Sequence, residues 1–178
     1  MKKMNKFLTA LILIILPIID INTLAVAQET ETAISGTKQV FRFEDYPVSV
    51  EQVSVVKKPI LSTRLAKQYK TAITTAMEQP VNFAGYYRVV TWGCGTDCRG
   101  FAIINKLTGK TYTLPGVEYV AGVMGNDEER LEYKENSRLF VITGSKNDKK
   151  EGKFYYLWSK EELKLLATFP LEKQDFSD

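Results

Sequence analysis

Two cysteines separated by three residues are the groups in this chain most able to form a covalent bond with each other. Cys94 and Cys98 are the two cysteines of the sequence, and a glycine stands on each side of Cys94. In an exported protein such a pair is expected to oxidise. The spacing predicts a Cys94–Cys98 disulfide that closes a tight hairpin with residues 95–97 at its tip. A free or redox-active pair is the alternative, although thioredoxin-type motifs have two intervening residues rather than three.

The lack of histidine restricts the chemistry of every other candidate group. The 178 residues contain none, which excludes Ser-His-Asp and Cys-His catalysis and an imidazole general base. Two cysteines without histidine do not make a normal zinc ligand set. The glycines around Cys94 fit neither the dinucleotide fingerprint nor the phosphate-binding loop, which ends in Gly-Lys-Ser/Thr. The sequence therefore predicts no metal and no cofactor.

Carboxylates remain as groups for acid–base chemistry. A hydrolase built on this chain would use Asp97 or Glu118 as general acid or base, with Tyr86 or Arg88 stabilising charge. Residues 127–129 form an acidic cluster, which we interpret as a solvated loop because its spacing does not match a calcium-binding loop.

Candidate binding residues lie in and around the same hairpin. They are Tyr86, Arg88, Trp92, Gly95, Thr96 and Asp97. A second aromatic group, Phe154, Tyr156 and Trp158, shares one face of a predicted strand because side chains alternate along a strand. We interpret this group as core packing, with a sugar- or peptide-binding strip as the alternative.

The first 27 residues have the pattern of a secretory signal peptide. Three lysines precede an uncharged apolar run at 7–19, and Ala-Val-Ala at 25–27 provides a cleavage site. The run is shorter than the roughly 20 apolar residues that span a membrane. The pattern predicts an exported protein, periplasmic or secreted, with no stable membrane anchor after cleavage.

Cleavage would leave a nearly neutral protein with one folded region. It removes three of the 24 basic and one of the 21 acidic residues, which leaves 21 and 20. No strong field then favours a nucleic acid as partner. We predict a flexible lead-in at 28–37, a single α+β domain at 38–170 and a polar tail at 171–178.

One amphipathic helix and many strands are expected. Apolar residues recur at three- and four-residue steps over 63–78, where Ser62 or Thr63 can cap the helix and Pro80 ends it. Short strands are predicted around 40–43 and 53–56, and further strands at 86–92, 101–105, 111–114, 119–123, from 132, 139–143 and 154–158, with a charged loop at 146–152. Residues 163–169 read as a strand or a short helix.

Two of the predicted strands, 101–104 and 139–142, are apolar at successive positions and should be buried on both faces. These patterns predict an α+β fold: a curved, mainly antiparallel sheet of six to eight strands with one major amphipathic helix.

The chain also resembles a known group of proteins. Asn-Phe-Ala-Gly at 82–85, a following tyrosine, Trp-Gly-Cys-Gly at 92–95 and then Cys98 are similar to a motif of small exported bacterial proteins whose activity is uncharacterised. The resemblance extends over roughly residues 46–158. Members often carry a histidine where this chain has Tyr86. The resemblance implies export and a single domain, and it implies no particular activity.

Together these patterns favour an exported, non-catalytic binding module of the cell envelope, either an inhibitor or a ligand-recognition protein. Its expected partner is a protein or glycan of the envelope, because a small disulfide-bonded domain with a rigid hairpin is suited to presenting a loop for binding. The alternative is the carboxylate-dependent envelope hydrolase.

Overall fold

An eight-stranded antiparallel sheet is the main element of the described residues. The structure is a computed structural model that describes residues 40–53 and 57–172. The strands are β1 (Tyr87–Gly93), β2 (Cys98–Asn105), β3 (Thr111–Tyr112), β4 (Val120–Ala121), β5 (Leu131–Tyr133), β6 (Leu139–Lys146), β7 (Lys150–Ser159) and β8 (Glu162–Phe169). Two short α-helices, α1 (Arg64–Gln68) and α2 (Lys70–Ala76), and one 3-10 turn, η1 (Phe43–Asp45), complete the described elements. The predicted fold class is confirmed.

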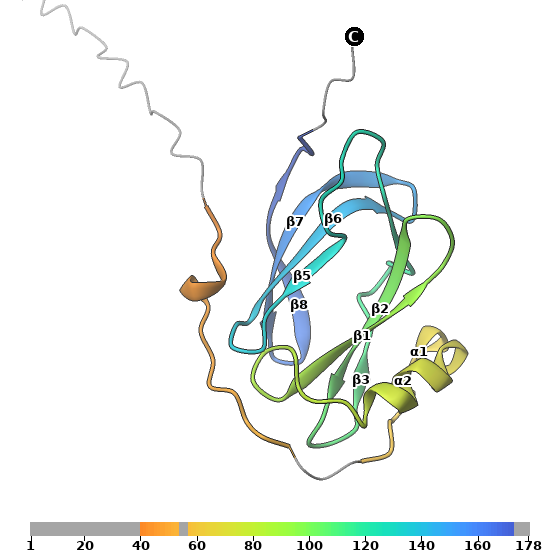
Figure 1. Cartoon of the computed structure of the whole chain (residues 1–178), viewed down its shortest axis with the longest axis vertical. Helices are drawn as coiled ribbons and strands as arrows, with labels where there is room; N and C mark the ends of the chain where they lie inside the picture. The colour runs from red at the N-terminus through yellow and green to blue at the C-terminus, as the bar shows by residue number, and fades with distance from the viewer. Residues whose placement is uncertain (1–39, 54–56, 173–178) are drawn as a thin grey trace, which may run out of the picture. The chain divides into compact units, whose positions relative to one another are not determined.

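The sheet has a short strand at its centre. Its path is β1-β2-β4-β6-β7-β8, while β3 pairs with β2 and β5 pairs with β6. Strand β4 joins the two halves only through residues near Cys98 on β2 and near Lys146 on β6. Beyond β4 the two halves separate (Figure 1). This leaves room for a layer of side chains between them.

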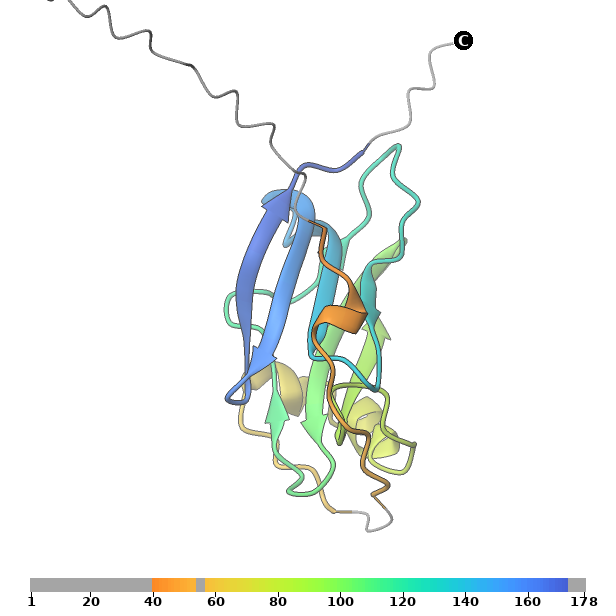
Figure 2. The ribbon, with the colours of Figure 1, turned by 90° about the vertical axis from the view of Figure 1, so that its left-hand side faces the viewer.

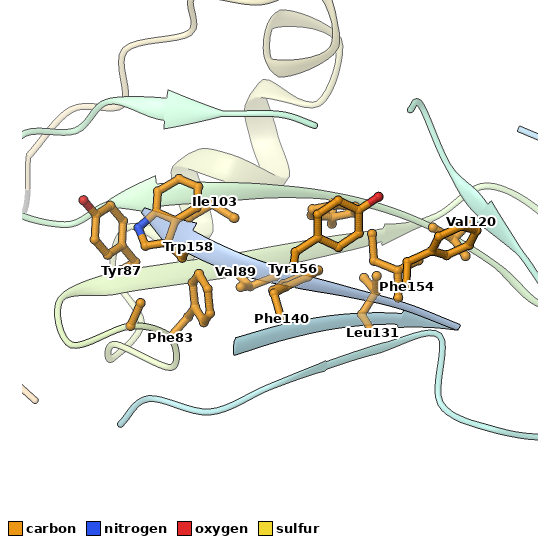
Figure 3. Packing of buried hydrophobic residues seen from close by; sticks show 13 residues of the cluster. Phe83, Tyr87, Val89, Ile103, Val120, Leu131, Phe140, Phe154, Tyr156 and Trp158 are labelled. Carbon is orange, nitrogen blue, oxygen red and sulfur yellow. The ribbon is translucent and has the colours of Figure 1, made fainter. Parts of the chain in front are cut away.

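The main core fills the space between the two halves. Strands β1 and β2 contribute Tyr87, Val89, Phe101 and Ile103, and β6 and β7 contribute Phe140, Ile142, Phe154, Tyr156 and Trp158. Phe154, Tyr156 and Trp158 of β7 lie in this layer (Figure 3). The predicted use of Phe154, Tyr156 and Trp158 as core residues is therefore confirmed, as is the burial of residues 101–104 and 139–142.

The helices cover the opposite face of β1 and β2 (Figure 1). The Thr63 hydroxyl accepts a hydrogen bond from the Ala66 amide at 3.0 Å, which makes Thr63 the N-cap. The predicted single helix over 63–78 is interrupted at Tyr69, whose φ and ψ are −102° and 29°. The Tyr69 ring stacks on Trp92 with 4.2 Å between centroids, so the interruption coincides with packing against the sheet.

The segment 40–53 runs along the other half of the sheet (Figure 2). The Phe41 ring stacks on Tyr155 of β7 at 4.8 Å, and Pro47 forms a bridge to Ser137. The strand predicted around 40–43 is wrong: the chain here forms the 3-10 turn η1 and adds no strand to the sheet. The strand predicted at 53–56 lies largely outside the described residues, as do the predicted signal peptide, lead-in and most of the tail.

The charged loop predicted at 146–152 is much shorter in the structure. Lys146 and Lys150 are paired partners of β6 and β7, so only three residues connect the strands. Asn147 and Asp148 have φ of 52° and 55°, a conformation that asparagine and aspartate tolerate better than most residues. Residues 163–169, left open between strand and helix, form part of β8.

Candidate functional site

The disulfide predicted from the sequence is present at the end of the β1–β2 hairpin. Cys94 and Cys98 are joined, with 5.2 Å between their Cα atoms. The pair follows directly from the strand register, in which Gly93 lies opposite Arg99. Residues 93–97 are exposed. We call residues 94–97 the tip.

Asp97 connects the tip to the centre of the sheet. Its carbonyl oxygen accepts a hydrogen bond from the Gly122 amide at 2.7 Å. Its carboxylate lies 3.5 Å from the Nε of Arg130. A side chain at Gly122 would collide with this carboxylate, so the approach requires glycine there. Asp97 has a left-handed φ of 49°. Its contacts with Gly122 and Arg130 hold it in that conformation.

Arg130 is the buried partner in this arrangement. Its side chain is 5% exposed, against 54% for Asp97. Its guanidinium also donates to the carbonyl oxygens of Asn126 at 2.9 Å and of Thr143 at 3.4 Å. A buried cation is tolerated when its donors have acceptors. Arg130 thus joins the tip, the loop before β5 and strand β6 at one point.

Reducing the disulfide is expected to lower the free energy of unfolding by about 1–3 kcal/mol, because the loop that it closes is short. The main sheet should persist, since its core lies away from the cysteines. Chemical denaturation with and without reductant measures the loss, and intact mass with alkylation reads the pairing. Two thiols that alkylate freely in the unreduced protein would contradict the pairing, and complete unfolding on reduction would contradict the expected size of the loss.

Trp92, a predicted binding residue, is buried. One face of its ring stacks on Tyr69, and its indole nitrogen occupies the space that a side chain at Gly100 would fill. The residue therefore serves to hold the helices against β1 and β2. The exposed candidates of this hairpin end are Gly95, Thr96 and Asp97.

Tyr86 and Arg88 lie at the other end of the hairpin. The length of β1 separates Tyr87 from Gly93 by about 20 Å. The Tyr86 ring stacks on Tyr87 at 4.6 Å, and Arg88 donates to the Pro80 carbonyl at 2.6 Å. Burial lowers the pKa of the Arg88 guanidinium. The structure does not bring these two residues to the Asp97 carboxylate.

Glu118 is also placed apart from the hairpin candidates. It forms an ion pair with Arg64 at the surface, beside the start of α1. The carboxylates and charge-stabilising groups of the predicted hydrolase are therefore distributed over separate regions of the described structure.

The Asn-Phe-Ala-Gly motif has a structural role. The Asn82 side chain accepts from the Val89 amide at 2.7 Å and donates to the Val89 carbonyl at 3.1 Å, so it pairs with β1 as a strand would. Ala84 and Gly85 then turn the chain with φ of 43° and 87°. A side chain at Gly85 would meet the Ser49 carbonyl oxygen at 2.7 Å. The motif positions the start of β1.

A hollow at the Tyr87 end of the sheet was not predicted from the sequence. It is lined in part by Tyr112, Trp158 and Glu161. Burial and then the neighbouring Glu161 carboxylate raise the pKa of Tyr112. Tyr112 comes from β3, whereas Trp158 and Glu161 belong to β7 and the turn after it, and these two parts of the chain meet only in the folded sheet. No local pattern in the sequence could have grouped them.

The acidic residues at 127–129 do not gather around a common point. Glu128 forms an ion pair with Lys153, which lowers the pKa of the Glu128 carboxyl. Among residues 40–53 and 57–172, no three histidine, cysteine, aspartate or glutamate side chains are grouped closely enough to hold a metal ion.

No family model, no curated protein and no solved structure matches this chain. The likeness to small exported bacterial proteins therefore stays a prediction. No helix in the described part of the chain is both long and apolar enough to cross a membrane.

Proposed function

We propose that this chain is an exported, non-catalytic binding module of the cell envelope, periplasmic or secreted, and that the disulfide-closed tip is its recognition element. Its partner is a protein or glycan of the envelope, and inhibition of an envelope-directed enzyme is one form that such binding takes.

One observation carries the proposal: the tip is exposed and yet held from several directions. The Cys94–Cys98 bond closes it, and the Asp97 carbonyl and carboxylate contact Gly122 and Arg130. A loop that is already ordered loses less conformational entropy when it binds, so more of the contact energy appears as affinity. A connection that only joined two strands would not need a buried arginine to fix it.

The most direct test is capture of a partner from an envelope extract by the immobilised mature protein, followed by quantitative mass spectrometry and glycan analysis. We expect saturable capture by the native chain and loss of capture by Thr96→Lys, because Thr96 is at the exposed tip. Thr74→Lys is the matched control, since it makes the same change at an exposed position of α2. Equal capture by all three proteins would mean that the tip is not the recognition element. Failure to recover any saturable partner would contradict the proposal that the chain is a binding module.

A further inference from the structure

A hollow lies beside Trp158, next to the main core. Its volume is about 270 Å³. It lies between the turn that joins β7 to β8 and the chain that leaves β3 at residues 113–115. The residues around it are Ser62, Thr63, Ile103, Thr111, Tyr112, Thr113, Leu114, Pro115, Trp158, Glu161, Glu162 and Leu163.

The size and the apolar side of the hollow indicate what kind of group fits. Pockets for whole small molecules usually start at about 300 Å³, so this one suits a single side chain. Ile103, Trp158 and Leu163 belong to the main core or pack against it, and Trp158 lies beside Ile103 (Figure 3). A ligand group entering here meets hydrocarbon and aromatic surface, which favours an alkyl stem.

The charge of the lining selects among groups that have such a stem. Glu161 and Glu162 line the hollow, and none of the residues that line it is lysine or arginine. The Tyr112 hydroxyl, and after it the charge of Lys110, lower the pKa of Glu161, so this carboxylate is ionised at neutral pH. Carboxylates next to aromatic rings attract an ammonium group both directly and through the ring faces.

The backbone holds Glu161 at this position. Lys160 and Glu161 form the two-residue turn between β7 and β8, and both have a left-handed φ, 52° and 63°. Turns of this type usually carry Asn-Gly or a similar pair, because other side chains are strained there. The short turn keeps the Glu161 carboxylate at the edge of the hollow.

We propose that this hollow binds the side chain of a lysine presented by a partner protein. The methylene stem lies against Trp158 and Leu163, and the ammonium group reaches Glu161. The site lies at the Tyr87 end of the β1–β2 hairpin, away from the tip, so the proposal does not depend on the tip as a recognition element.

A neighbouring lysine of the chain itself competes for the same carboxylate. Lys110 Nζ lies 3.5 Å from the Glu161 Oε2, and both side chains are substantially exposed. Exposed pairs of this kind are weak, so an incoming lysine can displace Lys110. Removing Lys110 should therefore strengthen binding, whereas removing Glu161 should weaken it. A general loss of folding would not produce these opposite effects.

The test uses the full mature protein and Nα-acetyl-lysine methylamide as the ligand, followed by amide and indole chemical shifts in NMR. We expect saturable shifts at Tyr112, Leu163 and the Trp158 indole. Nα-acetyl-norleucine methylamide has the stem without the charge and should bind at least ten-fold more weakly. Glu161→Gln should weaken lysine binding by ten-fold or more, and Lys110→Gln should strengthen it two- to five-fold.

Glu129→Gln is the matched control, because Glu129 is an exposed glutamate outside the hollow. It should leave the affinity for the lysine compound unchanged. Equal binding of the norleucine compound, shifts centred elsewhere on the protein, or unchanged affinity in Glu161→Gln would each overturn the proposal. None of these results bears on capture of a partner through Thr96, so the two proposals fail separately.

Discussion

Replacing Phe140 with alanine is expected to lower the free energy of unfolding by about 3–5 kcal/mol. Its ring is fully buried at the centre of the main core. The ring centroids of Phe101, Phe83 and Tyr133 lie 5.2, 5.5 and 5.6 Å from that of Phe140. Phe101 belongs to β2, Phe83 to the segment before β1, and Tyr133 to β5. Alanine would remove contacts to both halves of the sheet at once. Denaturant unfolding followed by circular dichroism measures the effect.

Leu165→Ala is the control for this prediction. Leu165 is also apolar and lies in β8, but it is 51% exposed. Replacing it with alanine should lower the free energy of unfolding by well under 1 kcal/mol. Similar losses for Phe140→Ala and Leu165→Ala would mean that the layer between the two halves is not the main source of stability.

Arg130→Met is expected to lower the free energy of unfolding by about 2–4 kcal/mol, because it leaves buried carbonyl groups without a donor. Those carbonyls belong to Asn126 and Thr143. The same change releases the Asp97 carboxylate, so exchange of the Gly122 amide, which donates to the Asp97 carbonyl, should become faster than in the native chain. Denaturant unfolding and hydrogen exchange give the two measurements.

Arg138→Met makes the same change at an exposed arginine and should alter stability by less than about 0.5 kcal/mol. If Arg130→Met lost stability without faster exchange at Gly122, Arg130 would support the loop before β5 but not the tip. If Arg130→Met changed neither the stability nor the exchange rate, the buried guanidinium would contribute nothing measurable to either.

Most strands could be predicted because their local composition and their tertiary role agree. Residues 101–104 and 139–142 are consecutive apolar residues, and each lies in a strand covered on both faces. Alternation in β7 places Tyr156 and Trp158 toward the core and Tyr155 toward Phe41. Turn lengths were less predictable, since Asn147 and Asp148 allow a tight connection within a segment that is charged throughout.

Other features depend on contacts that no local pattern contains. The helix interruption at Tyr69 coincides with stacking on Trp92, 23 positions later in the sequence. The disulfide was predictable because two neighbouring cysteines are enough to define it. Its connection to Arg130 was not, because Asp97 reaches that residue only after the sheet has formed. The burial of Trp92 was missed for the same reason, since the helices that cover it are packed there by the fold.

The pairing of Asn82 with Val89 has a consequence for the protein in concentrated solution. Strands β1 and β8 are the two ends of the main path of the sheet, and unpaired backbone groups on an outer strand can recruit another molecule into an aggregate. At β1 the Asn82 amide already occupies the Val89 N–H and carbonyl. At β8, Leu165 and Leu166 are exposed beside the charged side chains of Glu162 and Lys164. The two margins of the sheet thus resist intermolecular strand addition by different means: β1 through a side chain of its own molecule, β8 through charge.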